Sequence, residues 1–141
     1  MAAWRPFVTA ATIVIGALDA EMKAAFGISH FDHALLVMLV EQPQRQARMS
    51  DLARMLRLEP SHLTYRVGKL EKRGLVSRVA ATDDRRVTRA TITAEGVQLL
   101  RDAWPVHLAG IRRHFLSHVR ARDASAMARV LGSIAEEAHL D

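Results

Sequence analysis

The residues best suited to chemistry in this 141-residue sequence are the polar side chains between positions 61 and 73. If this stretch forms a helix at about 100° per residue, Leu63, Val67 and Leu70 cluster on one side, and a basic set takes the opposite side. That set comprises Ser61, His62, Tyr65, Arg66, Lys69 and Arg73. Arginine and lysine donate hydrogen bonds to base edges in the major groove. Serine and histidine can bind base edges that present both donors and acceptors. The pattern predicts a DNA recognition helix. The alternative is a solvated face, but such faces usually mix both signs of charge, and this set contains no acid.

A second basic group lies in the segment Thr82–Arg86, between two stretches rich in β-branched residues. Such a segment is typical of a hairpin tip, from which Arg85 and Arg86 can reach a narrow, electronegative minor groove. We expect Asp84 to hold Arg86 extended through a charge-assisted hydrogen bond. A solvated turn with internal ion pairs is the other interpretation of this tip.

Catalytic and metal-binding chemistry find little support in the sequence. It contains no H-E-x-x-H motif, no glycine-rich phosphate loop and no serine in a nucleophile-elbow context, so we expect no enzyme. The pairs His30/His33 and His114/His118 have spacings that place two imidazoles on one helix face. The chain has no cysteine, and no acidic residue lies beside His114 or His118. We therefore expect no metal and no cofactor, with these histidines on a partly exposed helix surface.

The charge is concentrated in the middle of the chain. The net charge is +5, but the segment from Arg45 to Arg89 holds 12 Lys and Arg against 5 Asp and Glu. This local excess favours a polyanionic partner such as nucleic acid. A hydrophobic content of 50% is enough for a core without disulfides, so we expect one folded unit.

Six helices are expected from apolar residues at three- and four-residue spacing and from capping residues. The first ends near Phe26, the second spans about Phe31–Glu41, the third is capped by Ser50, the fourth runs from Pro60 to Gly74, the fifth spans about Ala94–Val119, and the last spans about Ala124–Ala138. The polar segment Gln44–Arg48 is expected to be a linker. The apolar stretch Phe7–Leu18 is too short to span a membrane, and its periodicity indicates a packed helix in preference to a signal peptide.

The third and fourth helices, joined by a tight turn, predict a helix-turn-helix unit. The strands Leu75–Val79 and Val87–Ile92 then form a hairpin beside it. The expected fold class is mainly α with a small β-hairpin wing: a winged helix-turn-helix domain with a helical dimerisation region.

Three runs of this sequence together resemble the MarR family of winged-helix regulators. They are Arg48–Ala53, Leu70–Arg78, and Asp84–Arg86 followed by Thr93 and Gly96, within a match over about Phe31–Leu100. The resemblance implies a symmetric dimer with recognition helices in successive major grooves and a wing arginine in each adjacent minor groove. It places Ser61, Thr64 and Lys69 at positions that contact phosphates or bases, with Arg86 as the wing arginine and Asp84 as its support. The sequence departs from the family pattern at Tyr65, where arginine is frequent, and at Gly68, where aspartate is frequent.

The terminal helices carry more apolar side chains than a small basic domain needs, and pairing two copies would bury them. We therefore expect a homodimer and a roughly palindromic DNA site. The expected division is residues 1–43 for N-terminal dimerisation and support, 44–93 for the winged helix-turn-helix domain, and 94–141 for C-terminal dimerisation.

Relatives of this kind often release DNA when a small aromatic or acidic molecule binds between the dimerisation helices and the winged domain. The residues expected nearest such a crevice are Trp4, His33, Trp104 and His107. Packing at the dimer interface is the alternative role of both tryptophans. The resulting prediction is a cytoplasmic regulator that binds double-stranded DNA sequence-specifically, a repressor released by a ligand. The rival interpretations are a ligand-independent architectural DNA-binding protein and a helical protein-interaction module.

Overall fold

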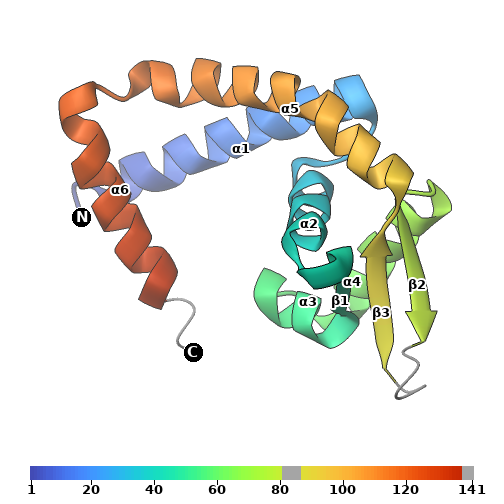
Figure 1. The fold of residues 1–141 in the computed structure, drawn as a ribbon. Coiled ribbons are helices and arrows are strands. Elements are labelled where there is room, and N and C mark those ends of the chain that lie inside the picture. The colour runs from blue at the N-terminus through green and yellow to red at the C-terminus, as the bar shows by residue number, and fades with distance from the viewer. Residues whose placement is uncertain (81–86, 138–141) are drawn as a thin grey trace.

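The computed structural model describes residues 1–80 and 87–137, which form an arch of helices with a winged domain at one end (Figure 1). The helices are α1 (Trp4–Phe26), α2 (His30–Glu41), α3 (Met49–Leu56), α4 (Pro60–Lys72), α5 (Ala94–His114) and α6 (Ala121–Glu137). The shorter elements are the 3₁₀ turns η1 (Pro43–Arg45) and η2 (Leu116–His118) and the strands β1 (Gln46–Arg48), β2 (Val76–Ala80) and β3 (Thr88–Ile92). We refer to the elements from α2 to β3 as the winged domain. The predicted fold class is confirmed.

The two long helices α1 and α5 run side by side along the arch (Figure 1). Gly110 of α5 makes their close approach possible, because a Cβ at this position would lie 2.7 Å from Leu18 Cδ2 and 2.5 Å from Glu21 Oε2. At the surface, Glu21 accepts a hydrogen bond from Arg113 at 2.8 Å and lies 2.7 Å from His114 Nε2. The expectation that His114 has no acidic neighbour was therefore wrong, because the neighbour comes from a helix distant in the sequence.

The core of the winged domain is built from the apolar stripes of its helices and the inward faces of its strands. Its most deeply buried side chains, each at most 5% exposed, include Leu35, Leu36, Leu39, Leu52, Leu63, Val67, Leu70, Val76 and Ile92. Each such side chain contributes about 1.5–3 kcal/mol through burial. This core fixes α4 against α2 and α3.

The wing is a three-stranded antiparallel sheet in the order β1-β3-β2. In its register, Ala47 of β1 faces Ala90 of β3, and Val76 of β2 faces Ile92 of β3. The residues of β1 were expected to form a linker, which was wrong. Three residues are too few to show an alternating pattern, and pairing with β3 is what makes them a strand.

The N-termini of α2 and α3 are closed in different ways. Ser29 Oγ accepts a hydrogen bond from Asp32 N at 2.9 Å, and the Asp32 carboxylate accepts one from Ser29 N at 3.2 Å, which together form a capping box. The expected cap Ser50 lies inside α3, whose N-cap is Arg48 with no side-chain hydrogen bond. The prediction for Ser50 was wrong because β1 keeps the backbone extended as far as Arg48 and the helix begins directly after it.

The C-terminal helices differ in length from the prediction. α5 ends at His114, short of Val119, because the backbone leaves the helical region at Phe115 and continues into η2. α6 turns back from there toward the start of α1 and begins earlier than expected. Within the described residues, no helix has the length and apolar character that crossing a bilayer requires.

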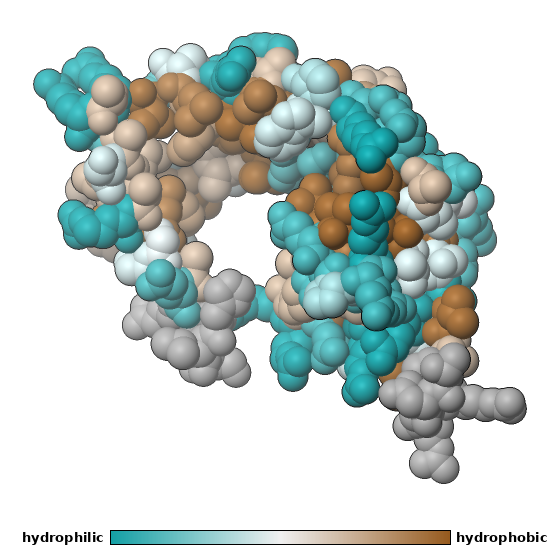
Figure 2. All heavy atoms as spheres, viewed as in Figure 1, coloured by the Kyte–Doolittle hydropathy of each residue, from teal (hydrophilic) through white to brown (hydrophobic). Residues whose placement is uncertain are grey.

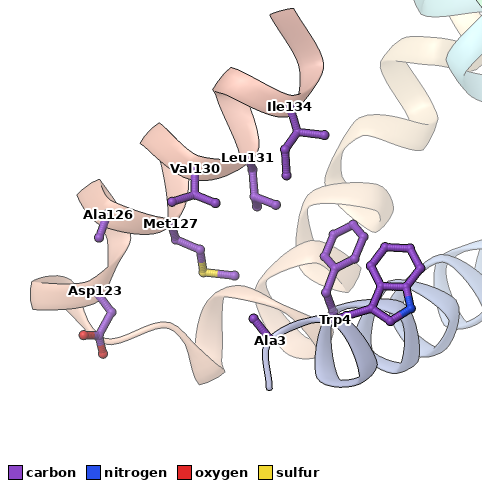
Figure 3. A pocket seen from close by; sticks show the side chains of 9 residues that line it. Ala3, Trp4, Asp123, Ala126, Met127, Val130, Leu131 and Ile134 are labelled. Carbon is purple, nitrogen blue, oxygen red and sulfur yellow. The ribbon is translucent and has the colours of Figure 1, made fainter. Parts of the chain in front are cut away.

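A hollow of about 610 Å³ separates α6 from the N-terminal turns of α1 (Figure 3). It is lined by Ala3, Trp4, Phe7, Asp123, Ala126, Met127, Val130, Leu131 and Ile134. Figure 2 shows hydrophobic residues on the helices that frame the open centre of the arch. These apolar faces therefore have no cover within the chain as described.

Replacing Gly96 with alanine is expected to destabilise the fold by about 2 kcal/mol, because a new Cβ would overpack the junction between the wing and α5. Gly96 N donates to Thr93 Oγ1, the cap of α5, and a Cβ here would collide with the Leu75 carbonyl oxygen and lie 2.7 Å from Ile92 Cγ1. Urea unfolding followed by circular dichroism at fixed protein concentration measures the change.

The matched control is Gly16→Ala in α1, where a Cβ meets nothing within 4 Å. Because alanine is the better helix former, this variant should gain up to about 1 kcal/mol. Equal unfolding free energies for the two variants would refute the assigned packing around Gly96.

Candidate nucleic-acid interface

The helix α4 has a buried side and an exposed side, as its sequence predicted. Leu63, Val67 and Leu70 are at most 1% exposed, whereas Tyr65 is 69% exposed. Pro60 occupies the first turn, where its missing N–H costs no helical hydrogen bond. The buried stripe therefore sets the rotation of α4 about its own axis and decides which side chains face away from the protein.

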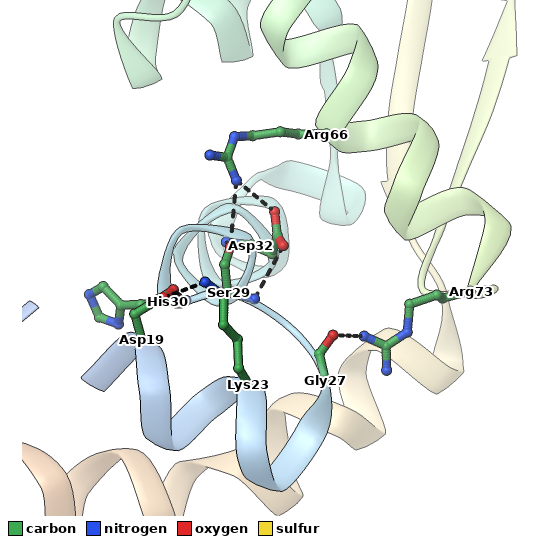
Figure 4. Close-up of polar contacts among 8 residues, drawn as sticks. All are labelled: Asp19, Lys23, Gly27, Ser29, His30, Asp32, Arg66 and Arg73. Carbon is green, nitrogen blue, oxygen red and sulfur yellow. Dashed lines mark hydrogen bonds and ion pairs between the residues drawn. The ribbon is translucent and has the colours of Figure 1, made fainter. Parts of the chain in front are cut away.

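Arg66 does not belong to that exposed face. Its Nη1 lies 3.2 Å from Asp32 Oδ1 and 3.5 Å from Ser29 Oγ (Figure 4). Its guanidinium lies 4.3 Å from the centre of the Phe31 ring. Its placement opposite Leu63 was wrong. On a helical wheel Arg66 lies only about 60° from Leu63, so its side chain leaves α4 along the flank that faces α2.

Arg73 lies on the same flank and is also used within the protein. Its Nη1 donates to the Gly27 carbonyl oxygen at 2.7 Å (Figure 4), and its Nη2 donates to the Phe26 carbonyl oxygen at 2.8 Å. These carbonyls belong to the C-terminal end of α1, where a cation satisfies unpaired acceptors and complements the helix dipole. Arg73 thus fastens the end of α4 to α1, and its predicted contact with DNA stays a prediction.

The side chains that remain on the outward surface of α4 form a smaller set than predicted. Ser61, His62, Thr64, Tyr65 and Lys69 are exposed. The Thr64 hydroxyl donates to the Pro60 carbonyl at 2.8 Å, and Lys69 Nζ lies 5.8 Å from the centre of the Tyr65 ring. This set carries hydrogen-bonding groups, one aromatic ring and one permanent cation, and we refer to it as the α4 outer face.

The wing is joined to α4 by an ion pair between Arg78 and Glu71, two residues for which the sequence predicted no role. The Arg78 guanidinium donates to Glu71 Oε2 at 2.6 Å and 2.9 Å, and Arg78 N donates to Glu71 Oε1 at 3.2 Å. These hydrogen bonds from Arg78 hold the pKa of the Glu71 carboxyl below its usual value. The predicted wing-tip residues Asp84, Arg85 and Arg86 lie outside the described residues.

The polar network at the α1–α2 turn was also missed. Asp19 Oδ1 accepts from His30 N at 2.9 Å, so α1 holds the first turn of α2 while Asp32 holds α4 (Figure 4). A sequence signal for part of it exists, because Ser29 and Asp32 have the spacing of a capping box. The pairing of Asp32 with Arg66 has no such signal, since 34 positions separate the two residues.

Three histidines meet where α2 packs against α5. The ring centres of His33 and His107 are 4.5 Å apart, and the His30 ring lies 5.3 Å from His107 and 6.5 Å from His33. His33 is only 4% exposed, so the expectation of a partly exposed surface was wrong for it. Burial, together with the neighbouring His107 and His30, lowers the pKa of His33 to about 4, and burial with His30 also lowers the pKa of His107. His33 and His107 are therefore neutral at pH 7.

The four residues expected around a ligand crevice fall into separate groups. His33 and His107 are in contact, but Trp4 is 59% exposed and lies with Phe7 at the hollow beneath α6, 6.1 Å between ring centres. Trp104 is 57% exposed on α5. Among residues 1–80 and 87–137, no three His, Cys, Asp or Glu side chains are grouped in a way that could hold a metal ion.

Comparisons with known proteins agree with this architecture. The model of the MarR family matches residues 28–88. The HTH-type transcriptional regulator MhqR of Bacillus subtilis is 33% identical over 118 residues, which cover 80% of this chain and 78% of MhqR. The chain belongs to the MarR family.

Solved structures of other MarR family members have the same overall shape. Sco3205 from Streptomyces coelicolor, solved in complex with DNA, is 31% identical with a TM-score of 0.89, over 96% of this chain and 84% of Sco3205. CouR from Rhodococcus jostii RHA1, solved with p-coumaroyl-CoA, is 29% identical with a TM-score of 0.76, over 91% of this chain and 87% of CouR. This MarR family protein is accordingly a DNA-binding transcriptional regulator.

Acidification is expected to weaken the fold of this MarR family protein through His33. The unfolded imidazole titrates near 6.5 and the folded one near 4, so the unfolded state binds the extra proton between these values. The contribution of neutral His33 to the free energy of unfolding is fully present above the pKa of the unfolded state, and it is lost as the pH falls below that value. Between pH 7.5 and pH 5 the loss through His33 should be about 2 kcal/mol in urea unfolding.

His33→Gln removes the buried titrating group, so its unfolding free energy should depend less on pH over this interval. His62→Gln, which removes an exposed imidazole from α4, is the control and should follow the parent protein. Identical pH dependence in the parent and in His33→Gln would rule out this assignment.

Proposed function

We propose that this MarR family protein binds a palindromic double-stranded operator as a homodimer and represses transcription until a small molecule releases it. The observation that carries the DNA-binding part is the α4 outer face, which presents donors and acceptors without a carboxylate on a helix whose orientation is fixed by the core. A helix of this kind fits the major groove and can read base edges there. We propose that the protein is cytoplasmic and acts there on the DNA.

Within the proposed interface, the residues of α4 have two kinds of role. Ser61, His62, Thr64, Tyr65 and Lys69 are the proposed contacts to phosphates or bases. Arg66 and Arg73 are proposed to position α4, because both guanidinium groups are bonded to other helices. For the wing, the family resemblance supports Arg86 in the minor groove, with Asp84 and Arg85 beside it.

The proposed homodimer follows from the unpartnered apolar faces of α1 and α6. Val130 and Ile134 of α6 are 49% and 55% exposed, and Ile13 of α1 is 63% exposed. Leaving so many apolar side chains in water is costly, and monomers rarely expose contiguous patches of this kind. A second copy meeting the first through these faces would cover both patches at once.

The proposed ligand site lies where α2 packs against α5, at His33 and His107. Two buried nitrogens there, Nδ1 of His30 and Nδ1 of His107, have no hydrogen-bond partner among the described residues. Such atoms favour a ligand that accepts or donates hydrogen bonds. CouR, solved with p-coumaroyl-CoA, supports a small aromatic or acidic molecule, and Trp4 and Trp104 then belong to the dimer interface.

Selection from a random pool of DNA duplexes tests the proposed function. At about 0.15 M salt, a dimer should enrich a palindromic sequence that it binds at least about a thousandfold more tightly than scrambled DNA. Enrichment of no sequence would favour an architectural DNA-binding protein, and no DNA binding at all would favour a protein-interaction module.

Variants of α4 then assign the contacts on the selected operator. If Lys69 contacts the DNA backbone, Lys69→Ala should weaken binding roughly tenfold. The slope of the logarithm of the binding constant against the logarithm of the salt concentration should then fall by about the amount for one phosphate contact. Arg101→Ala, which removes an exposed cation of α5, outside the proposed interface, is the control and should bind as the parent does.

Ile134→Asp is expected to break the homodimer. A carboxylate buried in an apolar interface costs about 3 kcal/mol or more, which raises the dimer dissociation constant at least a hundredfold. Sedimentation equilibrium at micromolar concentration should therefore change from two chains to one chain of 15.7 kDa.

Ser125→Asp adds the same charge to the opposite side of α6, since the two positions are half a helical turn apart in direction. This control should remain dimeric. If the dimer dissociation constant of Ile134→Asp equals that of the parent protein, α6 does not belong to the interface.

A further inference from the structure

A groove runs along the inner flank of α4, where this helix faces the α1–α2 turn. It encloses about 440 Å³ and is lined by Lys23, Ser29, Asp32, Leu58, His62, Tyr65, Arg66 and Lys69. A smaller hollow of about 100 Å³ adjoins it, shares Lys23, Ser29, Asp32 and Lys69, and extends the groove to Arg73. We call the two together the flank groove. It is distinct from the cluster of His30, His33 and His107, which lies between α2 and α5.

Positive charge predominates in the flank groove. Lys23 enters from α1, with its side chain extending toward Ser29 (Figure 4), while Arg66 and Lys69 enter from α4. Asp32 is the one carboxylate in the lining of the 440 Å³ hollow, and both of its oxygens are engaged, one by Arg66 and the other by Ser29 N. No carboxylate of the described residues lies within ion-pair distance of Lys69.

The cations keep free hydrogen-bonding capacity. Lys23 pairs with Asp19 at 2.6 Å, but its side chain is 60% exposed and an ammonium carries three donors. The Arg66 side chain remains 37% exposed although it is bonded to Asp32. The groove therefore offers donors from two helices to one anion between them.

We propose that the flank groove binds a phosphate monoester with a small apolar or planar group. A phosphate monoester carries close to two negative charges at pH 7, which suits two lysines and a partly neutralised arginine better than a single carboxylate does. Leu58 and Tyr65 supply an apolar wall beside these cations, and the volume lies within the range of small-molecule pockets.

Occupation of the flank groove and binding of DNA exclude each other. This step rests on the proposed function, because the groove is lined by His62, Tyr65 and Lys69 of the α4 outer face. A dianion bound to Lys69 would prevent this side chain from pairing with a phosphate of the DNA backbone. It would also repel the phosphates of the duplex.

The test uses phenyl phosphate as the probe and the full-length protein without DNA. Calorimetric titration at constant ionic strength should give saturable binding, whereas phenol, which lacks the phosphate, should give none. Lys23→Gln removes a groove cation that lies outside the proposed DNA contacts, and it should weaken phenyl phosphate binding at least about tenfold. Lys72→Gln removes an exposed lysine outside the groove and should leave that binding unchanged.

A second arm uses the selected operator and distinguishes a free phosphate ester from the DNA backbone. Phenyl phosphate should displace the operator from the parent protein, and a higher concentration should be needed with Lys23→Gln. Absence of saturable binding, or equal binding by the parent and Lys23→Gln, would overturn the site. If Lys23→Gln instead weakens operator binding and lowers the salt dependence by about one phosphate, the groove serves the DNA backbone and the proposal is wrong.

Because the calorimetric titration contains no DNA, its result does not depend on whether the protein binds an operator. Binding of phenyl phosphate without displacement of DNA would overturn the exclusion step alone.

Discussion

The carboxylate of Asp32 holds together the part of the molecule that aims α4. One of its oxygens closes the N-terminus of α2 by accepting from Ser29 N, and the other accepts from the Arg66 guanidinium of α4. Asp32 is only 7% exposed, so an uncompensated charge there would be costly, and the two partnerships compensate it. Asp19 of α1 accepts a hydrogen bond from His30 N in the same turn, and Arg73 at the end of α4 donates a hydrogen bond to the carbonyl oxygen of Gly27 there. The direction of the proposed recognition helix is consequently set from the α1–α2 turn as well as from the core beneath it.

This arrangement divides the cations of α4 by use. Those on the flank, Arg66 and Arg73, are bonded to carboxylate or carbonyl oxygens and position the helix. Lys69 faces outward, near the ring of Tyr65. A basic helix can therefore carry a high charge while only part of that charge is available to DNA, and the sequence count of cations overstates the contact surface.

The histidine cluster and the apolar faces lie on the helices that join the winged domain to the rest of the arch. The imidazoles of His30, His33 and His107 lie where α2 meets α5, so a proton or a ligand placed there acts directly on the contact between the winged domain and the long helices. α6 and the start of α1 present apolar side chains at the far end of the arch (Figure 2). In a symmetric pair, α5 would connect the interface at one end with the wing at the other, so the spacing of the two recognition helices would depend on this junction.

The sequence by itself determined the class of fold, the family and the two-sided character of α4. These rest on local signals: the spacing of Leu63, Val67 and Leu70, the proline at the start of α4, and the β-branched stretches of the wing. The tertiary structure alone decided which cations face outward, because the partners of Arg66, Arg73 and Arg78 depend on how the helices and wing are placed against one another. It also decided the third strand, which exists only through pairing with β3, and the burial of His33 against His107. Periodicity records which side of an element is apolar, but a long polar side chain at the edge of that side chooses its partner from whatever the folded chain places within its reach.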